Sequence, residues 1–114
     1  METKNAKITS TMLGYEDHGI LSCMLYLSYG GSGQGFGGYC LDSYDKEKEK
    51  RIATIHCGVW IAEILKIVGV EKWEDLKGQH IRVRSEHGKV HSIGNLLEDR
   101  WFNPEKDLKH LGEA

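Results

Sequence analysis

The 114-residue sequence predicts an α+β fold, with an antiparallel sheet of about five strands, one long packed helix and a short C-terminal helix. Residues 20–29 alternate side chains in the manner of a long half-buried strand, and residues 80–86 repeat that alternation. Residues 55–68 instead carry apolar side chains at helical spacing. Because turn residues join successive strands, we expect those strands to be antiparallel.

The composition predicts one globular domain over residues 1–114. The chain is 39% apolar and 28% charged, which is enough apolar content for a single core and excludes a disordered chain. Its formal net charge is only −2, so the sequence gives no bulk electrostatic reason to expect naked nucleic acid as a partner.

Three cysteines, at positions 23, 40 and 57, favour a reducing cytosol. Their number is odd and no CxxC pair is present, which argues against a secreted disulfide framework. Residues 1–6 lack the apolar region of a signal peptide. The longest apolar stretch, residues 59–70, is interrupted by two charged residues and a glycine, so we expect no membrane span.

The first third of the chain predicts three strands in a meander. The ranges are Lys7–Leu13, Ile20–Tyr29 and Phe36–Leu41. Between the second and third strands, residues 30–38 contain six glycines in nine positions, and we expect an exposed glycine-rich loop there. The second strand places alternate side chains on its two faces, and the two sets are Leu21, Cys23, Leu25, Leu27 and Tyr29 on one face and Ile20, Ser22, Met24, Tyr26 and Ser28 on the other.

The middle of the chain predicts an exposed segment followed by the main helix. Residues 42–51 are a run of mixed charges that suits a linker or the solvated first turns of a helix. The helix is expected over Ile55–Val68, with Thr54 as N-cap and Gly69 as the C′ residue. Apolar side chains cover more than half of its circumference, so it is expected to be largely buried against the sheet.

The last third predicts a hairpin and a terminal helix. A single helical turn is expected within residues 70–78, and strands are expected at His80–Glu86 and Val90–Leu96 around a tight His87-Gly88 turn. Asn103 as N-cap followed by Pro104 predicts a helix start. That helix is expected to face Leu108 and Leu111 inward and to end at Gly112.

The glycine segment formally contains a G-x-G-x-x-G dinucleotide fingerprint at residues 33–38. A helix should follow that fingerprint, but Tyr39-Cys40-Leu41 is typical of a strand, so dinucleotide binding is not expected. Two interpretations remain for the glycines. They are structural, as a tight or bulged turn between long strands or as backbone packed against a tryptophan or the helix, or they form a loop that contacts a ligand or a protein partner.

Cysteine and histidine offer a second candidate chemistry. No set of four has the paired short spacings of a structural zinc site, and we expect no metal or cofactor. Cys40 is a conceivable nucleophile, with His18 or His56 as base and Asp42 nearby, if glycine-loop amides stabilise an oxyanion. Cysteines that pack as small apolar residues are the more common case.

Arg82 and Arg84, with His80 and Lys89, form a basic strand on the late hairpin. Nucleic-acid binding there is weakly supported, because Glu86, Glu98 and Asp99 dilute the positive charge and cross-strand ion pairs explain it as well. Trp101 and Phe102 are expected to fix the terminal helix to the core.

Three segments, residues 35–42, 70–78 and 93–104, resemble small uncharacterised proteins of tailed bacteriophages and prophages. The resemblance spans most of the chain. It implies a phage accessory protein in the host cytoplasm that binds a host or defence-system protein, as anti-CRISPR proteins do.

The leading expectation is therefore a binding protein rather than an enzyme, a monomer or homodimer that inhibits a bacterial defence system such as CRISPR-Cas. The alternative is a small ligand-binding protein or enzyme that uses the Gly30–Gly38 loop to cradle an anion. The expected partner-binding residues come from the glycine segment and the basic strand: Gly31, Ser32, Gln34, Gly35, Phe36, Gly37, Tyr39, Arg82 and Arg84.

Overall fold

The computed structural model describes residues 2–16, 19–29 and 31–108, and their fold is α+β, as the sequence predicts. The described residues contain eight strands where about five were expected from the alternation pattern. In chain order the elements are β1 (Glu2–Tyr15), β2 (Leu21–Tyr29), β3 (Ser32–Gly37), β4 (Asp42–Asp45), β5 (Lys50–Ala53), α1 (Ile55–Val68), η1 (Trp73–Asp75), β6 (His80–Glu86), β7 (Lys89–Gly94), β8 (Trp101–Phe102) and α2 (Pro104–Asp107).

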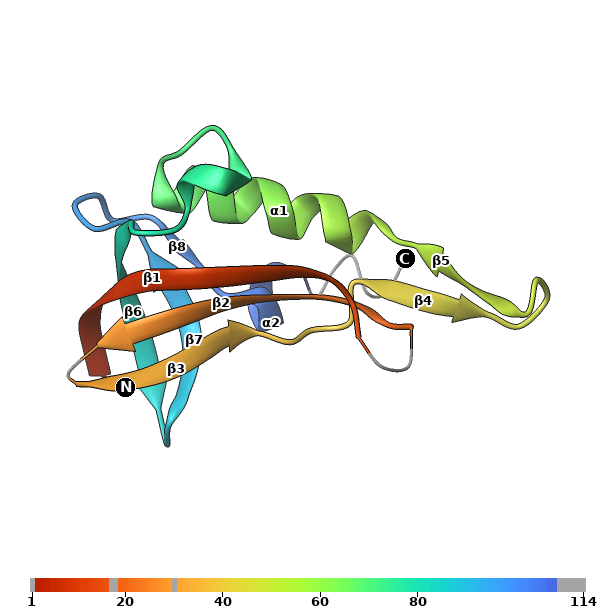
Figure 1. Cartoon of the computed structure of the whole chain (residues 1–114), viewed down its shortest axis with the longest axis horizontal. Coiled ribbons are helices and arrows are strands. Elements are labelled where there is room, and N and C mark those ends of the chain that lie inside the picture. The colour runs from red at the N-terminus through yellow and green to blue at the C-terminus, as the bar shows by residue number, and fades with distance from the viewer. Residues whose placement is uncertain (1, 17–18, 30, 109–114) are drawn as a thin grey trace.

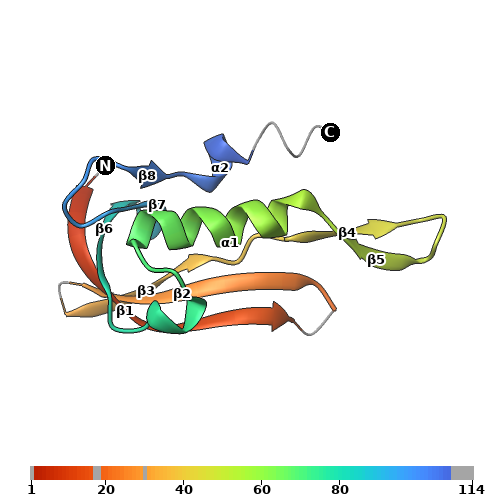
Figure 2. The same ribbon diagram turned by 90° about the horizontal axis from the view of Figure 1, so that it is seen from above.

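Six strands form one curled antiparallel sheet in the order β3-β2-β1-β6-β7-β8, and β4 and β5 form a separate two-stranded sheet. The long strand β1 makes the curl, because residues 2–7 pair with β6 whereas residues 7–15 pair with β2. A register shift between Ile8 and Ser10 bends β1 where the two pairings meet. As a result β3 lies close to β7, and α1 runs along the open side of the curl (Figures 1 and 2).

The centre of the core is a cluster of three aromatic rings from β3, α1 and β8. Phe36 stacks on Trp60 with ring centroids 5.4 Å apart, and Phe102 meets Trp60 edge-on at 5.4 Å. The three side chains are at most 1% exposed. Aromatic pairs of this geometry add to the gain from burial, so they join the helix to both ends of the strand order.

The glycine segment is a strand and not a loop, which corrects both the predicted loop over residues 30–38 and the predicted strand over residues 36–41. Phe36 lies opposite Leu25 on the inner face, and Gly35 and Gly37 lie opposite Tyr26 and Met24 on the outer face. A Cβ at Gly35 would collide with the Met24 methyl group, and one at Gly37 would collide with the Cys23 carbonyl oxygen. Glycine is needed at position 37 because the β2 backbone approaches it closely, whereas at Gly35 the flexible Met24 side chain would have to move.

Helix α1 has the predicted bounds, and Gly69 ends it with φ 89°, donating its N–H to the Leu65 carbonyl. Thr54 stands at the N-cap position, but its hydroxyl donates to the Leu41 carbonyl at 2.7 Å instead of capping the helix. The buried face of the helix consists of Trp60, Ile64, Ile67 and Val68.

The charged run is a β-hairpin, so the prediction of a linker or helical turn over residues 42–51 is wrong. Asp42 pairs with Ala53 and Asp45 pairs with Lys50. The Asp45 carboxylate accepts backbone N–H donors from residues 47 and 48, which closes the turn between the strands.

The late hairpin and the start of the terminal helix are confirmed. Strands β6 and β7 meet at the His87-Gly88 turn, and Asn103 Oδ1 accepts from the Lys106 N–H at the start of α2. Strand β7 ends at Gly94, short of the predicted Leu96, and the two-residue strand β8 was not predicted. Leu108 is buried as expected, whereas Leu111 and Gly112 lie outside the described residues. In the part of the chain that the structure describes, no helix has the length and apolar character needed to cross a membrane.

Candidate functional site

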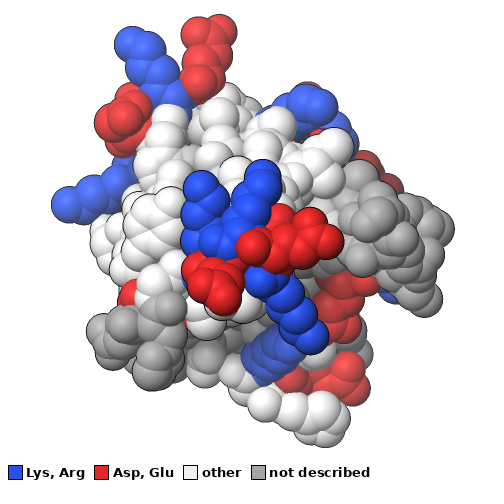
Figure 3. All heavy atoms as spheres, turned by 90° about the vertical axis from the view of Figure 1, so that its right-hand side faces the viewer, with Lys and Arg blue, Asp and Glu red and all other residues white. Residues whose placement is uncertain are grey.

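The β4–β5 ribbon extends away from the rest of the molecule (Figure 1). With the ribbon included, the molecule measures 46 × 31 × 27 Å along its principal axes. The residues of the ribbon are largely exposed, and Tyr44 is 55% exposed. Seen from the ribbon end, positive and negative side chains lie side by side and form no patch of one sign (Figure 3). The ribbon therefore offers an aromatic ring among mixed charges.

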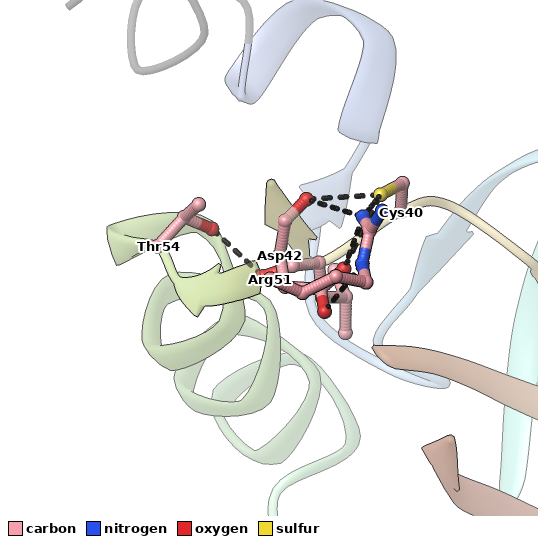
Figure 4. A network of polar contacts seen from close by, with 5 residues as sticks. Cys40, Asp42, Arg51 and Thr54 are labelled. Carbon is pink, nitrogen blue, oxygen red and sulfur yellow. Dashed lines mark hydrogen bonds and ion pairs between the residues drawn. The ribbon is translucent and has the colours of Figure 1, made fainter. Parts of the chain in front are cut away.

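The base of the ribbon is held by a polar network of Cys40, Asp42 and Arg51 (Figure 4). Arg51 donates from Nε to Asp42 Oδ2 at 2.9 Å and from Nη2 to Oδ1 at 2.7 Å, a two-point ion pair. The Asp42 side chain is only 5% exposed. The Cys40 thiol donates to the Asp42 carbonyl at 2.9 Å, and Arg51 Nη2 lies 3.2 Å from Cys40 Sγ.

This network keeps Asp42 charged. Hydrogen bonding from Arg51 lowers the pKa of the Asp42 carboxyl to about 2, with burial opposing that shift. The same contact raises the pKa of the Arg51 guanidinium. The pair is therefore fully ionised at neutral pH, and together with the Thr54 hydrogen bond to Leu41 it fixes the ribbon to the start of α1.

The structure places Cys40 beside Asp42, which the cysteine-catalysis hypothesis requires. However, no histidine is among the hydrogen-bond partners of Cys40 in the described residues. His56 Nε2 is buried and has no hydrogen-bond partner in the described part of the chain, and His18 lies outside it. Cys23 is 1% exposed and packs in the core, and this burial raises the pKa of its thiol to about 11. No metal-binding group of three or more His, Cys, Asp or Glu occurs among the described residues.

The predicted partner-binding residues do not gather on one surface. Phe36 is a core residue, and Tyr39 is half-buried with its ring centroid 5.5 Å from that of Trp60. Burial raises the pKa of the Tyr39 hydroxyl. Gly31 is exposed at the turn, and Ser32 begins β3. Gly35 and Gly37 lie against β2, whereas Gln34 faces inward opposite Leu27.

Arg82 and Arg84 lie on the outer face of β6, opposite to the buried Ile81 and Val83. Both guanidinium groups lie over the Trp101 ring, at 4.9 Å for Arg82 and 3.8 Å for Arg84. Trp101 thus belongs to the outer surface, so the prediction that it fixes the terminal helix to the core is wrong, whereas Phe102 is fully buried in the core. The sequence predicted a basic strand but not the ring beneath it.

An open hollow of about 360 Å³ lies where the tips of β1, β2 and β3 approach the β6–β7 turn. In this hollow, Lys4 Nζ lies 3.2 Å from Glu2 Oε2, and His87 Nε2 lies 3.5 Å from Glu86 Oε1. Two carboxylates in the lining disfavour an anionic ligand. The hollow is lined by Glu2, Lys4, Tyr29, Gln34, Ser85, Glu86, His87 and Gly88.

No protein-family model matches the chain, and no curated protein or solved structure is significantly similar to it.

Proposed function

We propose that this protein acts by binding another macromolecule, and that the β4–β5 ribbon is a principal contact. The observation that carries the proposal is the anchored ribbon. A two-stranded hairpin is at best marginally stable by itself, and ordering it costs conformational entropy. Here the Asp42–Arg51 ion pair, the Cys40 thiol and the Thr54 hydroxyl fix its base, while Tyr44 remains exposed.

An ordered, projecting ribbon suits protein recognition. Tyrosine is enriched at protein interfaces because its rigid ring gives apolar contact and its hydroxyl gives a hydrogen bond. The mixed charges seen at the ribbon end (Figure 3) are the kind of polar surroundings that border such a ring at protein interfaces. Neither feature serves the core, since the ribbon extends beyond it.

The finer proposal concerns the partner. We propose a phage accessory protein that acts in the host cytoplasm and inhibits a bacterial defence system such as CRISPR-Cas, as a monomer or homodimer. Its support is the resemblance of residues 35–42, 70–78 and 93–104 to small phage and prophage proteins. The projecting ribbon is a suitable contact element for such a protein partner.

The test uses bacteria with an active CRISPR-Cas system that targets a phage. Expression of the wild-type protein is expected to restore plaque formation, and tagged protein is expected to retain a defence component through a high-salt wash. Tyr44→Ala should weaken both effects. Tyr15→Ala is the matched control, since Tyr15 is 73% exposed on β1 outside the ribbon. No plaque restoration and no retained partner would contradict the proposal.

A second candidate function is small-ligand binding in the hollow that contains Gln34. The Gly30–Gly38 segment was expected to cradle an anion as a loop, but Ser32–Gly37 instead pair with β2 as a strand. The lining favours a neutral or cationic ligand. A thermal-shift screen with nucleotides, cyclic nucleotides and divalent metals tests this candidate, because a ligand of the native state raises Tm. A rise with an anionic nucleotide alone would overturn that preference.

A further inference from the structure

We propose that Arg84, stacked on Trp101, binds a single carboxylate side chain on a segment of a protein partner. This inference rests on the proposed function and adds a second contact, outside the ribbon. It concerns the outer face of the sheet where β6, β7 and β8 lie side by side.

The two arginines on this face have different surroundings. Arg82 donates from Nε to the Asn95 carbonyl at 2.8 Å and from Nη2 to the Glu98 carbonyl at 2.8 Å. Arg82 therefore holds the Asn95–Arg100 loop against the sheet. The Arg84 guanidinium makes no hydrogen bond or ion pair with another side chain or backbone group of the described residues, and it lies over the Trp101 ring at 3.8 Å.

The platform under Arg84 is itself fixed. Trp101 lies over Gly94, where a Cβ would come within 2.6 Å of the ring. The indole Nε1 donates to Asp99 Oδ1 at 2.9 Å, and Arg82 contacts the ring at 4.9 Å. A guanidinium stacked on a fixed ring keeps its N–H edge available in one orientation, so little side-chain entropy is lost when an acceptor binds.

The free N–H donors select the chemistry of the partner. A planar guanidinium binds a carboxylate or a phosphate through two parallel hydrogen bonds. Three acidic residues surround this face, Glu86, Glu98 and Asp99, and all three are exposed. They would repel the many phosphates of a nucleic acid but still admit a single carboxylate, so a protein segment that presents one carboxylate is the better match.

Arginine and tryptophan are also the side chains that dominate binding energy at protein interfaces. Leu97 is 88% exposed on the adjoining loop, which gives the partner an apolar contact beside the charged one. The partner segment is therefore expected to combine a carboxylate with a neighbouring apolar side chain.

The experiment selects from a random 12-residue peptide display library against the full-length protein. The expected result is an enriched consensus with Asp or Glu beside an apolar residue. Arg84→Gln should weaken the selected peptides roughly 10- to 100-fold, the range of a charge-assisted hydrogen-bond pair. Arg100→Gln is the matched control and should change affinity by less than about threefold, because Arg100 already pairs with Glu98 at 2.8 Å.

Three outcomes would overturn the inference: no enriched peptide, a consensus without an acidic residue, or equal loss in both arginine variants. Tighter, Arg84-dependent binding of a single-stranded oligonucleotide than of the selected peptides would also overturn it, in favour of nucleic acid. The ribbon experiment with Tyr44→Ala is independent of Arg84. If the ribbon binds a partner and the display fails, the carboxylate site alone is wrong.

Discussion

Replacing Phe36 tests whether the glycine-rich segment is a core strand. Phe36 is 1% exposed and contacts two further rings, with centroid distances of 5.4 Å to Trp60 and 6.3 Å to Phe102. Phe36→Ala removes a buried ring and leaves a cavity, which costs about 3–5 kcal/mol of unfolding free energy. For a domain of this size that loss lowers Tm by roughly 10–25 °C.

The assay is chemical denaturation followed by circular dichroism, with Tm measured in parallel. Gln34→Ala is the control, because Gln34 is half-buried on the same strand and lies outside the aromatic cluster. It should cost less than about 1 kcal/mol. An exposed loop would tolerate both substitutions, so a loss below about 1 kcal/mol for Phe36→Ala would refute the strand assignment and the packing derived from it.

Three other predictions follow from burial, backbone geometry and charge. Gly37→Ala should strongly lower Tm, because φ is +127° and a Cβ meets the Cys23 carbonyl, whereas Gly33→Ala should be tolerated, since its Cβ would lie 3.5 Å from the nearest atom. Asp42 has a folded pKa of about 2, below its unfolded value, so its stabilisation is complete above about pH 4 and is lost as pH falls to about 2. Amide protection of the ribbon should therefore be lower at pH 2 than at pH 7, and Asp42→Asn should show lowered protection already at neutral pH. A ribbon equally protected at pH 2 and pH 7 would contradict this. Iodoacetamide at pH 8 should label exposed Cys40 long before buried Cys23, and mass spectrometry that found the reverse order would contradict the burial.

Much of the fold was predictable because its signals are local. The apolar spacing and Gly69 defined α1, the alternation of Ile81, Val83 and Ser85 defined the buried face of β6, and Asn103-Pro104 defined the start of α2. In each case the residues that determine the element lie within it or next to it.

The remaining elements depend on contacts between distant residues. Glycines hide the alternation of β3, since its outer positions carry no side chain, and only the neighbouring strand, through the Cys23 carbonyl, shows why Gly37 must be small. The charged run pairs as a ribbon through Asp42 and Arg51, nine positions apart, which a helix or linker pattern does not distinguish. The Arg84–Trp101 stack joins β6 to a strand of two residues, too short for a sequence pattern.

If the anchored ribbon contacts a partner macromolecule, as we propose, its backbone amides should be protected in the complex. The most direct measurement is hydrogen exchange with mass spectrometry on the free protein and on its complex with the partner retained from a defence-active lysate. We expect exchange to slow on binding in peptides covering residues 42–53. Unchanged exchange across residues 42–53, with protection confined to other strands, would contradict the claim.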